Sequence, residues 1–280
     1  MKKYWIIAVI FCAAIYMCGH TSLESKPAEQ SVGTLERLDD LNSPKYCVGV
    51  PLGGKAMKIG EEQFTKSRIC YFNSPKTAYE AILQRKADAF LFGSHALDFI
   101  DSRHPDLTVL PGVTERVDIA IAFPPEQGDL RYQVNRFISL CKADGTYEEM
   151  YKRWFKTRRL PSMPYIEKPA KPTRTIRVGT CSQVPPMCFL DRETEEPSGF
   201  DMELVQRLAL HLNARIVVLD MDFHTLFEAL DEGRIDMGIA GLNKDDKRPD
   251  QVIYSNNYID SYIVAIVHSE LLKNRKKAAK

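Results

Sequence analysis

Cysteines are the residues of this sequence whose type and spacing most directly suggest chemistry. The 280-residue chain contains 7 of them. Exported proteins use such thiols for disulfides, whereas a structural zinc site needs clustered cysteine and histidine ligands at short spacings. No spacing of cysteine and histidine here matches a zinc site. Cys181 and Cys188 flank one short loop that contains prolines, so we expect them to pair, with two separate buried thiols as the alternative.

The N-terminal segment has the layout of an export signal. Lysines precede an apolar run from about Trp5 to Met17, which is short for a membrane-spanning helix. We expect residues 1–18 to be a signal peptide, with a short membrane anchor as the alternative. Cys18 stands at the end of the apolar run, where it could carry a lipid, so both lipidation and simple cleavage remain open.

Composition limits the classes of protein to consider. Hydrophobic residues make up 44% of the chain and charged residues 27%, which is enough apolar material for a buried core. The formal net charge is +1, so there is no electrostatic case for binding nucleic acid. Five cysteines follow the signal region, and this odd number leaves at least one of them free or paired with another chain.

Predicted strands and helices alternate along most of the chain. A polar tether at 19–32 is followed by apolar runs at 46–54 and 117–124 that predict strands, and by two helices over 128–155. Such alternation predicts parallel α/β layers.

A proline-rich segment divides the sequence into two parts. Residues 157–173 contain four prolines and several basic residues, which predicts an extended linker. On either side of it, residues 79–92 and 226–240 nearly repeat each other: helix, basic turn, aspartate and buried strand. The repetition predicts two lobes of similar build rather than a long repeat array.

The stretch GFDMELVQRLALHL, residues 199–212, predicts an amphipathic helix. Leu204, Leu208 and Leu212 recur at helical spacing, and Asp201 stands where it could cap the helix. This stretch fits, at every constrained position, the signature of the family 3 extracellular solute-binding proteins, the polar amino-acid receptors of ABC importers.

The resemblance to this family extends over nearly everything after residue 33. The second half of the chain resembles the first lobe of the family, and the first half resembles its second lobe and closing helices. The resemblance implies an α/β, two-lobe, type II periplasmic binding protein-like fold with a hinge and an interlobe cleft. The matching segments are 177–180, 185–187, 199–212, 221–242, 247–258 and 262–267 for the first lobe, and 38–54, 87–94 and 142–155 for the remainder.

These parts occur in an unusual order, since lobe two precedes lobe one. We expect a circular permutation in which the proline linker joins the family's old C-terminus to its old N-terminus. Two truncated modules in tandem, or a swap between chains, is the alternative. The expected segments are signal peptide 1–18, tether 19–32, lobe two 33–122, closing helices packing on lobe one 123–156, linker 157–173, lobe one with a hinge strand 174–268, and a frayed basic tail 269–280.

The resemblance also implies site residues on lobe one. Arg248 stands at the motif position of an arginine that holds the carboxylate of the ligand, because a guanidinium matches a carboxylate bidentately. Asn243 occupies a position usually held by serine or threonine and can still offer hydrogen bonds. Phe223 matches an aromatic residue that packs on the ligand, and Gly241 belongs to the same region.

On lobe two the resemblance implies an anion-binding turn. Gly53, Gly54 and Lys55 match a turn that opens a helix, where backbone N–H groups meet an anion. Gly93 and Ser94 follow the strand whose end faces the cleft, and Gly93 stands where the family has its amine-binding aspartate. This departure favours a ligand without an ammonium group, such as a small organic acid. The alternatives are an unusual amino acid whose amine is met by Asp118, Glu115 or water, and a loss of ligand binding altogether.

The expected function is therefore that of a solute-binding protein. It would capture a small carboxylate-bearing ligand, an amino acid or related organic acid, and deliver it to the membrane subunits of an ABC importer. The expected protein is a monomer without cofactor or metal, in the periplasm or on the outer face of a membrane. The alternatives are an enzyme such as a cyclohexadienyl (prephenate/arogenate) dehydratase, for which no paired carboxylates specify the acid, and a ligand-sensing module for a membrane partner.

Overall fold

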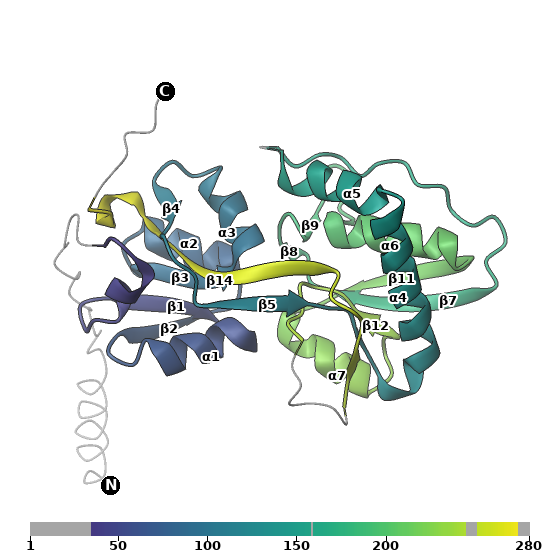
Figure 1. Ribbon diagram of the computed structural model, residues 1–280, viewed down its shortest axis with the longest axis horizontal. Helices are drawn as coiled ribbons and strands as arrows, with labels where there is room; N and C mark the ends of the chain where they lie inside the picture. The colour runs from purple at the N-terminus through teal and green to yellow at the C-terminus, as the bar shows by residue number, and fades with distance from the viewer. Residues whose placement is uncertain (1–34, 158, 245–250, 274–280) are drawn as a thin grey trace, which may run out of the picture. The chain divides into compact units, whose positions relative to one another are not determined.

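Strands from both halves of the chain combine into two mixed sheets in the computed structural model of the protein (Figure 1). The structure describes residues 35–157, 159–244 and 251–273, which lie in one unit spanning residues 31–280. The expected signal peptide and tether, including Cys18, lie outside the described residues. None of the helices in the described ranges is long and apolar enough to cross a membrane.

The first sheet has six strands and contains one strand from the far end of the chain. Its order is β2-β1-β3-β14-β4, with β5 also paired to β14. The pairs β1–β2 and β1–β3 are parallel, whereas β14 runs antiparallel to β3, β4 and β5. The strands are β1 (Cys47–Pro51), β2 (Arg68–Phe72), β3 (Ala89–Gly93), β4 (Leu107–Val109), β5 (Glu115–Ile119) and β14 (Ile259–His268).

Helices cover both faces of the first sheet because its buried strands are apolar on both sides. In β3, Leu91 packs in one core cluster with Ile59 of the helix α1, while Phe90 packs in another with Ile82 of α2 and Leu97 of α3. These elements are η1 (Leu38–Leu41), α1 (Gly54–Gln63), α2 (Pro75–Leu83) and α3 (Ser94–Asp101).

The second sheet repeats the same arrangement with five strands. Its order is β11-β7-β12-β6-β13, in which β6 comes from the first half of the chain and pairs antiparallel with both neighbours. A separate small antiparallel sheet has the order β10-β9-β8. The strands are β6 (Ala122–Phe123), β7 (Arg174–Thr180), β8 (Gln183–Val184), β9 (Cys188–Leu190), β10 (Pro197–Ser198), β11 (Ala214–Asp220), β12 (Met237–Gly238) and β13 (Ile253–Tyr254).

The helix α5 is fixed to the second sheet's helix α6 by a buried carboxylate. Glu203 is fully buried and accepts hydrogen bonds from Arg153 at 2.7 and 2.9 Å, from Trp154 at 2.7 Å and from Arg207 at 2.8 and 3.0 Å. Charge-assisted bonds of this kind satisfy an otherwise costly buried charge. The remaining elements are η2 (Pro125–Gln127), α4 (Gly128–Ala143), α5 (Thr146–Phe155), α6 (Phe200–His211), η3 (Phe223–Thr225), α7 (Leu226–Asp231) and η4 (Ser269–Leu271).

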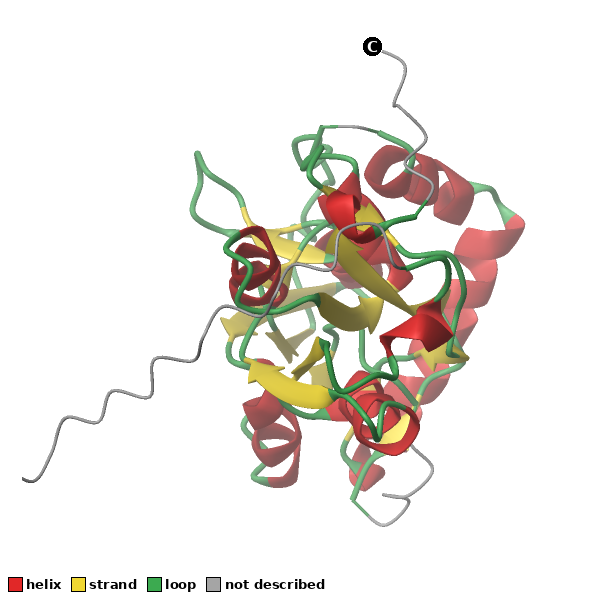
Figure 2. Ribbon diagram, turned by 90° about the vertical axis from the view of Figure 1, so that its left-hand side faces the viewer, coloured by secondary structure: helices red, strands yellow, loops and turns green. Residues whose placement is uncertain are grey.

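Two segments of chain connect the sheets and run antiparallel beside each other, residues 115–123 and 253–268 (Figures 1 and 2). The single strand predicted over 117–124 is broken into β5 and β6. The break occurs because Ala120 donates its N–H to the carbonyl of Leu242 at 2.9 Å, and Ile121 donates to the hydroxyl of Ser255 at 2.9 Å. The connection thus passes from one sheet to the other at these two residues.

The first and last described segments of the chain pair with each other. Leu35 donates its N–H to the carbonyl of Leu271 at 2.8 Å, and its own carbonyl accepts from Lys273 at 3.0 Å. Leu271 is only 6% exposed. The expectation of a frayed tail after Glu270 is therefore wrong for residues 271–273, because Leu271 has a buried position that no local pattern predicts.

The disulfide of the structure differs from the expected one. Cys47 of β1 and Cys70 of β2 are bonded, with Cα atoms 6.4 Å apart on adjacent parallel strands. Cys181 and Cys188 are free and buried, as is Cys141. The expected pair is wrong because Cys181 packs in one core cluster and Cys188 in another.

Candidate functional site

A cleft with about 890 Å³ of empty space, including some open solvent, is lined by residues from both sheets and the connections between them. The first sheet contributes the ends of β1 and β3 together with the first residues of α1 and α3. The second contributes the loop after β7, the start of η3 and residues 240–243 after β12. Of the predicted site residues, seven line this cleft: Gly53, Gly54, Lys55, Gly93, Phe223, Gly241 and Asn243.

The glycine turn before α1 opens the helix toward the cleft. Gly53 and Gly54 have φ values of 90° and 77°, a left-handed backbone that favours glycine. A Cβ at Gly54 would lie 3.7 Å from the ring of Phe223 on the other side of the cleft. The N-terminus of α1 therefore faces a residue of the second sheet's half, and its free N–H groups can meet an anion there.

Lys55 adds a cation whose charge is already partly balanced. Its ammonium lies 3.0 Å from the carboxylate of Glu115, and both side chains are partly exposed. An exposed pair of this kind holds its partners weakly, so Lys55 remains free to exchange Glu115 for an anionic ligand.

The second sheet's side of the cleft is held by backbone pairing and by a buried acid. Asn243 forms an isolated antiparallel bridge with Ile119 at the point where the chain crosses between sheets. Beneath Gly241, the hydroxyl of Tyr258 donates to the carboxylate of Asp201 at 2.9 Å. Burial raises the pKa of Asp201 to about 7, although the Tyr258 hydroxyl and the Gly241 backbone lower it.

This position corrects the expectation that Asp201 caps α6. The residue that caps the helix is Gly199, with φ 122°, and no side chain makes a capping hydrogen bond there. A Cβ at Gly199 would lie 2.4 Å from the carbonyl oxygen of Met187, so only glycine fits this turn. Asp201 points instead into the protein, where it supports the loop that carries Gly241.

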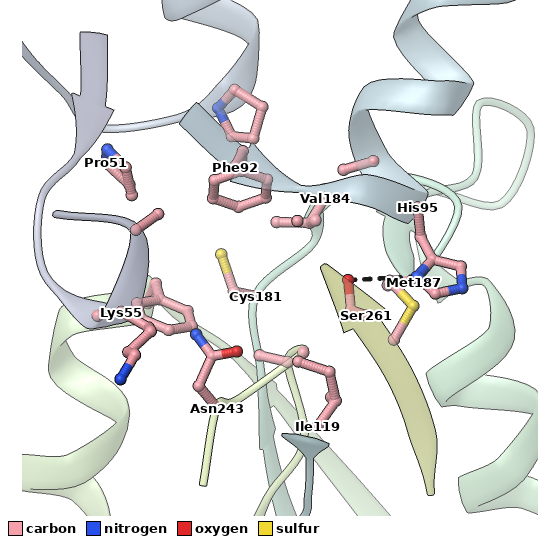
Figure 3. A pocket seen from close by; sticks show the side chains of 18 of the residues that line it. Pro51, Lys55, Phe92, His95, Ile119, Cys181, Val184, Met187, Asn243 and Ser261 are labelled. Atoms are coloured by element: carbon pink, nitrogen blue, oxygen red, sulfur yellow. Dashed lines mark hydrogen bonds between the residues drawn. The ribbon is translucent and has the colours of Figure 1, made fainter. Parts of the chain in front are cut away.

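Sequence reasoning predicted Ser94 but missed His95 and Ser261, which form a cluster of polar groups with it opposite the α1 turn (Figure 3). The hydroxyl of Ser261 on β14 lies 3.4 Å from Nδ1 of His95 and 3.3 Å from the hydroxyl of Ser94. Ser261 and His95 line the cleft, whereas Ser94 lines a neighbouring pocket. The sequence signal for His95 was its position directly after the end of a buried strand. Ser261 had no such signal, because it is 166 residues away from His95 along the chain.

His95 is an uncharged imidazole at neutral pH. Burial lowers its pKa to about 4, and Lys156 also lowers it, while Asp260 acts in the opposite direction. The ring packs edge to face against Phe155, with centroids 4.7 Å apart.

Apolar side chains make up most of the remaining wall. Val184 and Met187 flank the Pro185–Pro186 bond, which is cis, and the thiol of Cys181 lies nearby in the view of Figure 3. The described lining contains no aspartate or glutamate, and the described residues contain no group of three or more side chains that could hold a metal ion. The cleft of the described residues is thus suited to holding an apolar molecule by a few polar contacts.

Arg248, the predicted carboxylate-binding residue, lies outside the described residues, in the segment 245–250. The described neighbours on either side are Lys244, which donates its N–H to the carbonyl of Asp118 at 3.0 Å, and Gln251. The role of Arg248 therefore stays a prediction.

Comparison with known proteins identifies relatives of the second half of the chain. The sequence profile of the bacterial extracellular solute-binding proteins, family 3, matches residues 176–276. A probable histidine-binding protein of Campylobacter jejuni is 30% identical over 89 residues, which is 32% of this chain and 34% of the relative. The arginine-binding extracellular protein ArtP of Bacillus subtilis is 35% identical over 85 residues, 30% of this chain and 32% of the relative. The chain thus spans about a third of the length of these relatives.

Among solved structures, an ancestral arginine-binding protein bound to glutamine is 38% identical, with a TM-score of 0.26. The match covers 28% of this chain and 34% of that one. These relatives are named as binding proteins.

Proposed function

We propose that this chain captures a small carboxylate-bearing solute outside the cytoplasm and delivers it to an ABC importer, and the match of residues 176–276 to the bacterial extracellular solute-binding proteins, family 3, supports this. The solute would be an amino acid or a related organic acid. The observation that carries the proposal is the cleft lined by both sheets, at the place where the chain crosses between them.

The proposed ligand carboxylate lies between the two halves. The N–H groups at the start of α1 and the side chain of Asn243 supply hydrogen bonds, and Arg248 supplies a bidentate cation. Phe223 packs on the body of the ligand. Contacts from both sides of the cleft favour a closed arrangement of the lobes, and the two crossing segments are the hinge about which they would close.

The first test is to identify what the protein carries. Mass spectrometry of small molecules released from purified, denatured protein should detect a carboxylic acid in stoichiometric amounts. Calorimetry on Arg248→Ala should then show a loss of about 2–5 kcal/mol of binding free energy, because the proposed bidentate partner of the carboxylate is removed. Arg215→Ala, on an exposed residue of β11, is the matched control. Unchanged affinity in Arg248→Ala would remove this residue from the site.

We also propose that the domain is a circular permutation of its family's fold. The two sheets share one strand order, in which the fourth strand comes from the other half of the chain. Leu35 and Leu272 form a parallel bridge, so the ends of the described chain lie side by side. This proximity supports the proposal that β14 and η4 were connected directly to η1 in an ancestor. The ends of the present chain would then have been opened between η4 and η1.

A reverse permutation tests this proposal. A short linker would join Lys273 to Leu35, and new ends would be opened within 159–173, where the structure has no helix or strand. The rearranged protein should unfold at a similar denaturant concentration and bind the same solute. The control cuts the chain within α6 and should not fold. A rearranged protein that fails to fold while the parent folds would contradict the proposal.

The proposed location is the periplasm or the outer face of a membrane. The description of the matching family as extracellular supports this. Attachment through a lipid on Cys18 would keep the protein at the membrane, and mass spectrometry of the mature N-terminus distinguishes a lipidated Cys18 from a simply cleaved end.

A further inference from the structure

Four of the polar side chains that line the cleft lie in two separate pairs with apolar side chains between them, and Asn73, Ser74 and Gln183 line it as well. In Figure 3 Lys55 and Asn243 lie on one side, and His95 and Ser261 lie on the other. Phe92 is among the apolar side chains between them. A molecule that fills the cleft therefore has an apolar body and can present one polar group to each end.

The two ends differ in charge. The end with Lys55 combines a cation with the N-terminus of α1, so it suits a carboxylate. The end with Ser261 and His95 is uncharged, since burial keeps the imidazole neutral. The charged groups that act on His95 are Lys156 and Asp260, neither of which is among the residues lining the cleft.

From this arrangement we infer that Ser261 and His95 bind an uncharged hydroxyl or carbonyl group of the ligand, and that the ligand is a hydroxy or oxo carboxylic acid with an apolar side chain. The inference rests on the proposed function and specifies its solute class. A hydroxyl beside a neutral imidazole can both donate and accept, and so matches either group.

An ammonium group would be disfavoured at the same place. It would lose its hydration without gaining an anionic partner from the described lining, which is costly in a mostly apolar cleft. The backbone leaves the space for the ligand group open, because residue 93 is a glycine. A Cβ there would already lie 3.4 Å from the hydroxyl of Ser261.

Matched sets of ligands test the inference by calorimetry on the full chain. One set is L-phenylalanine, phenyllactate, phenylpyruvate and 3-phenylpropionate, and a second is the corresponding series built on leucine. We expect the hydroxy or oxo acid to bind at least about tenfold more tightly than the amino acid with the same side chain. The acid without a second polar group should bind with intermediate affinity.

Variants at the cluster connect this preference to its residues. Ser261→Ala should weaken binding of the hydroxy acid by about threefold to tenfold and leave the acid without the hydroxyl within about twofold. Ser261→Asp should reverse the preference toward the amino acid, because it supplies the missing anion. Ser139→Ala, on an exposed part of α4, is the control and should change neither. Ser261→Thr keeps the hydroxyl and should retain the preference, and His95→Phe, which removes the other polar group of the pair, serves if Ser261→Ala does not fold.

The outcomes separate two failures. If no member of either set binds, both the proposed carboxylate function and the ligand class are overturned. If an amino acid binds as tightly as its hydroxy or oxo counterpart, only the ligand class is overturned. If the preference is present and persists in Ser261→Ala as well as in Ser261→Thr, the Ser261–His95 pair is not the cause of the preference.

Discussion

The two sheets place their strands in the same order, yet different interactions hold them together. Each takes one strand from the other half of the chain: β14 in the first sheet and β6 in the second. β14 is ten residues long and pairs with three strands, whereas β6 is two residues long. The first sheet therefore depends far more on its borrowed strand than the second does.

The cross-links differ as well. The first sheet has a disulfide between its neighbouring strands β1 and β2. The helices on the second sheet are connected through the buried carboxylate of Glu203 and its two arginine partners. The same topology is thus compatible with a covalent link in one half and an ionic link in the other.

Among the changes that test this comparison, removal of β14 should have the largest effect on the stability of the protein. Deletion of residues 262–280 takes away the partner of β3, β4 and part of β5, so the first sheet splits. We expect the cooperative unfolding transition in denaturant to disappear, because the loss exceeds the roughly 5–15 kcal/mol by which a domain is stable. Tyr262→Thr, at a half-exposed position of the same strand, should retain the transition. A cooperative transition in the truncated chain would show that the first sheet does not need β14.

Removal of the ionic link should have the next largest effect. Glu203→Ala leaves Arg153 and Arg207 without their shared partner, and should lower the free energy of unfolding by about 3–5 kcal/mol. The control is Glu148→Ala, which removes an exposed pair with Lys152 and should cost no more than about 0.5 kcal/mol. Equal effects of the two substitutions would mean that the burial of Glu203 adds nothing.

Loss of the disulfide should cost slightly less. The double substitution Cys47→Ala and Cys70→Ala opens a link between residues separated by 23 positions, for which chain entropy gives about 3 kcal/mol. Reductant should destabilise the parent by a similar amount in denaturant titrations and leave the double variant unaffected. If reductant shifts the double variant too, the destabilisation has another source.

A difference that depends on pH separates Asp201 from the surface acids. Its folded-state pKa is about 7, above the usual value of 3.8, so the native state binds more protons between these pH values. Its contribution to stability is complete below pH 3.8 and is lost as the pH rises through 7. Asp201→Asn should remove a loss on the order of 4 kcal/mol over this range, as measured by denaturant titrations at several pH values. A stability–pH profile identical to that of the parent would contradict the assignment.

The protonation of His95 changes the free energy of unfolding with pH in the opposite direction, so its effect must be distinguished from that of Asp201. Its pKa falls from 6.5 to about 4 on folding, so its contribution is present above pH 6.5 and is lost as the pH falls toward 4. The double variant Asp201→Asn and His95→Phe should show neither slope.

The sequence predicted the fold through local patterns, and these are the parts that the structure shares with the prediction. The signature at 199–212 forms α6, and the break between α4 and α5 falls at Asp144 and Gly145. The predicted glycine turn at residues 53 and 54 lines the cleft. It could be predicted because its left-handed backbone conformation is one that glycine adopts readily. Such features depend on residues close together in the chain.

Features that depend on register could not be predicted in this way. The bond between Cys47 and Cys70 follows from how two strands pair, whereas Cys181 and Cys188 are close in sequence but pack in separate clusters. Ser261 enters the cleft on a strand from the other end of the chain. A linear pattern contains no signal for contacts of this kind.

The position of β14 also determines the order in which the protein can be completed during synthesis. The ribosome makes β1 to β5 first, but β4 and β5 join this sheet only through β14, which is finished about 150 residues later. At ordinary rates of translation this delay is on the order of ten seconds. The second sheet has its borrowed strand β6 first, and its last strand, β13, is made before β14 begins. The half that is synthesised first is therefore completed last, and the edge of β3 stays unpaired in the meantime.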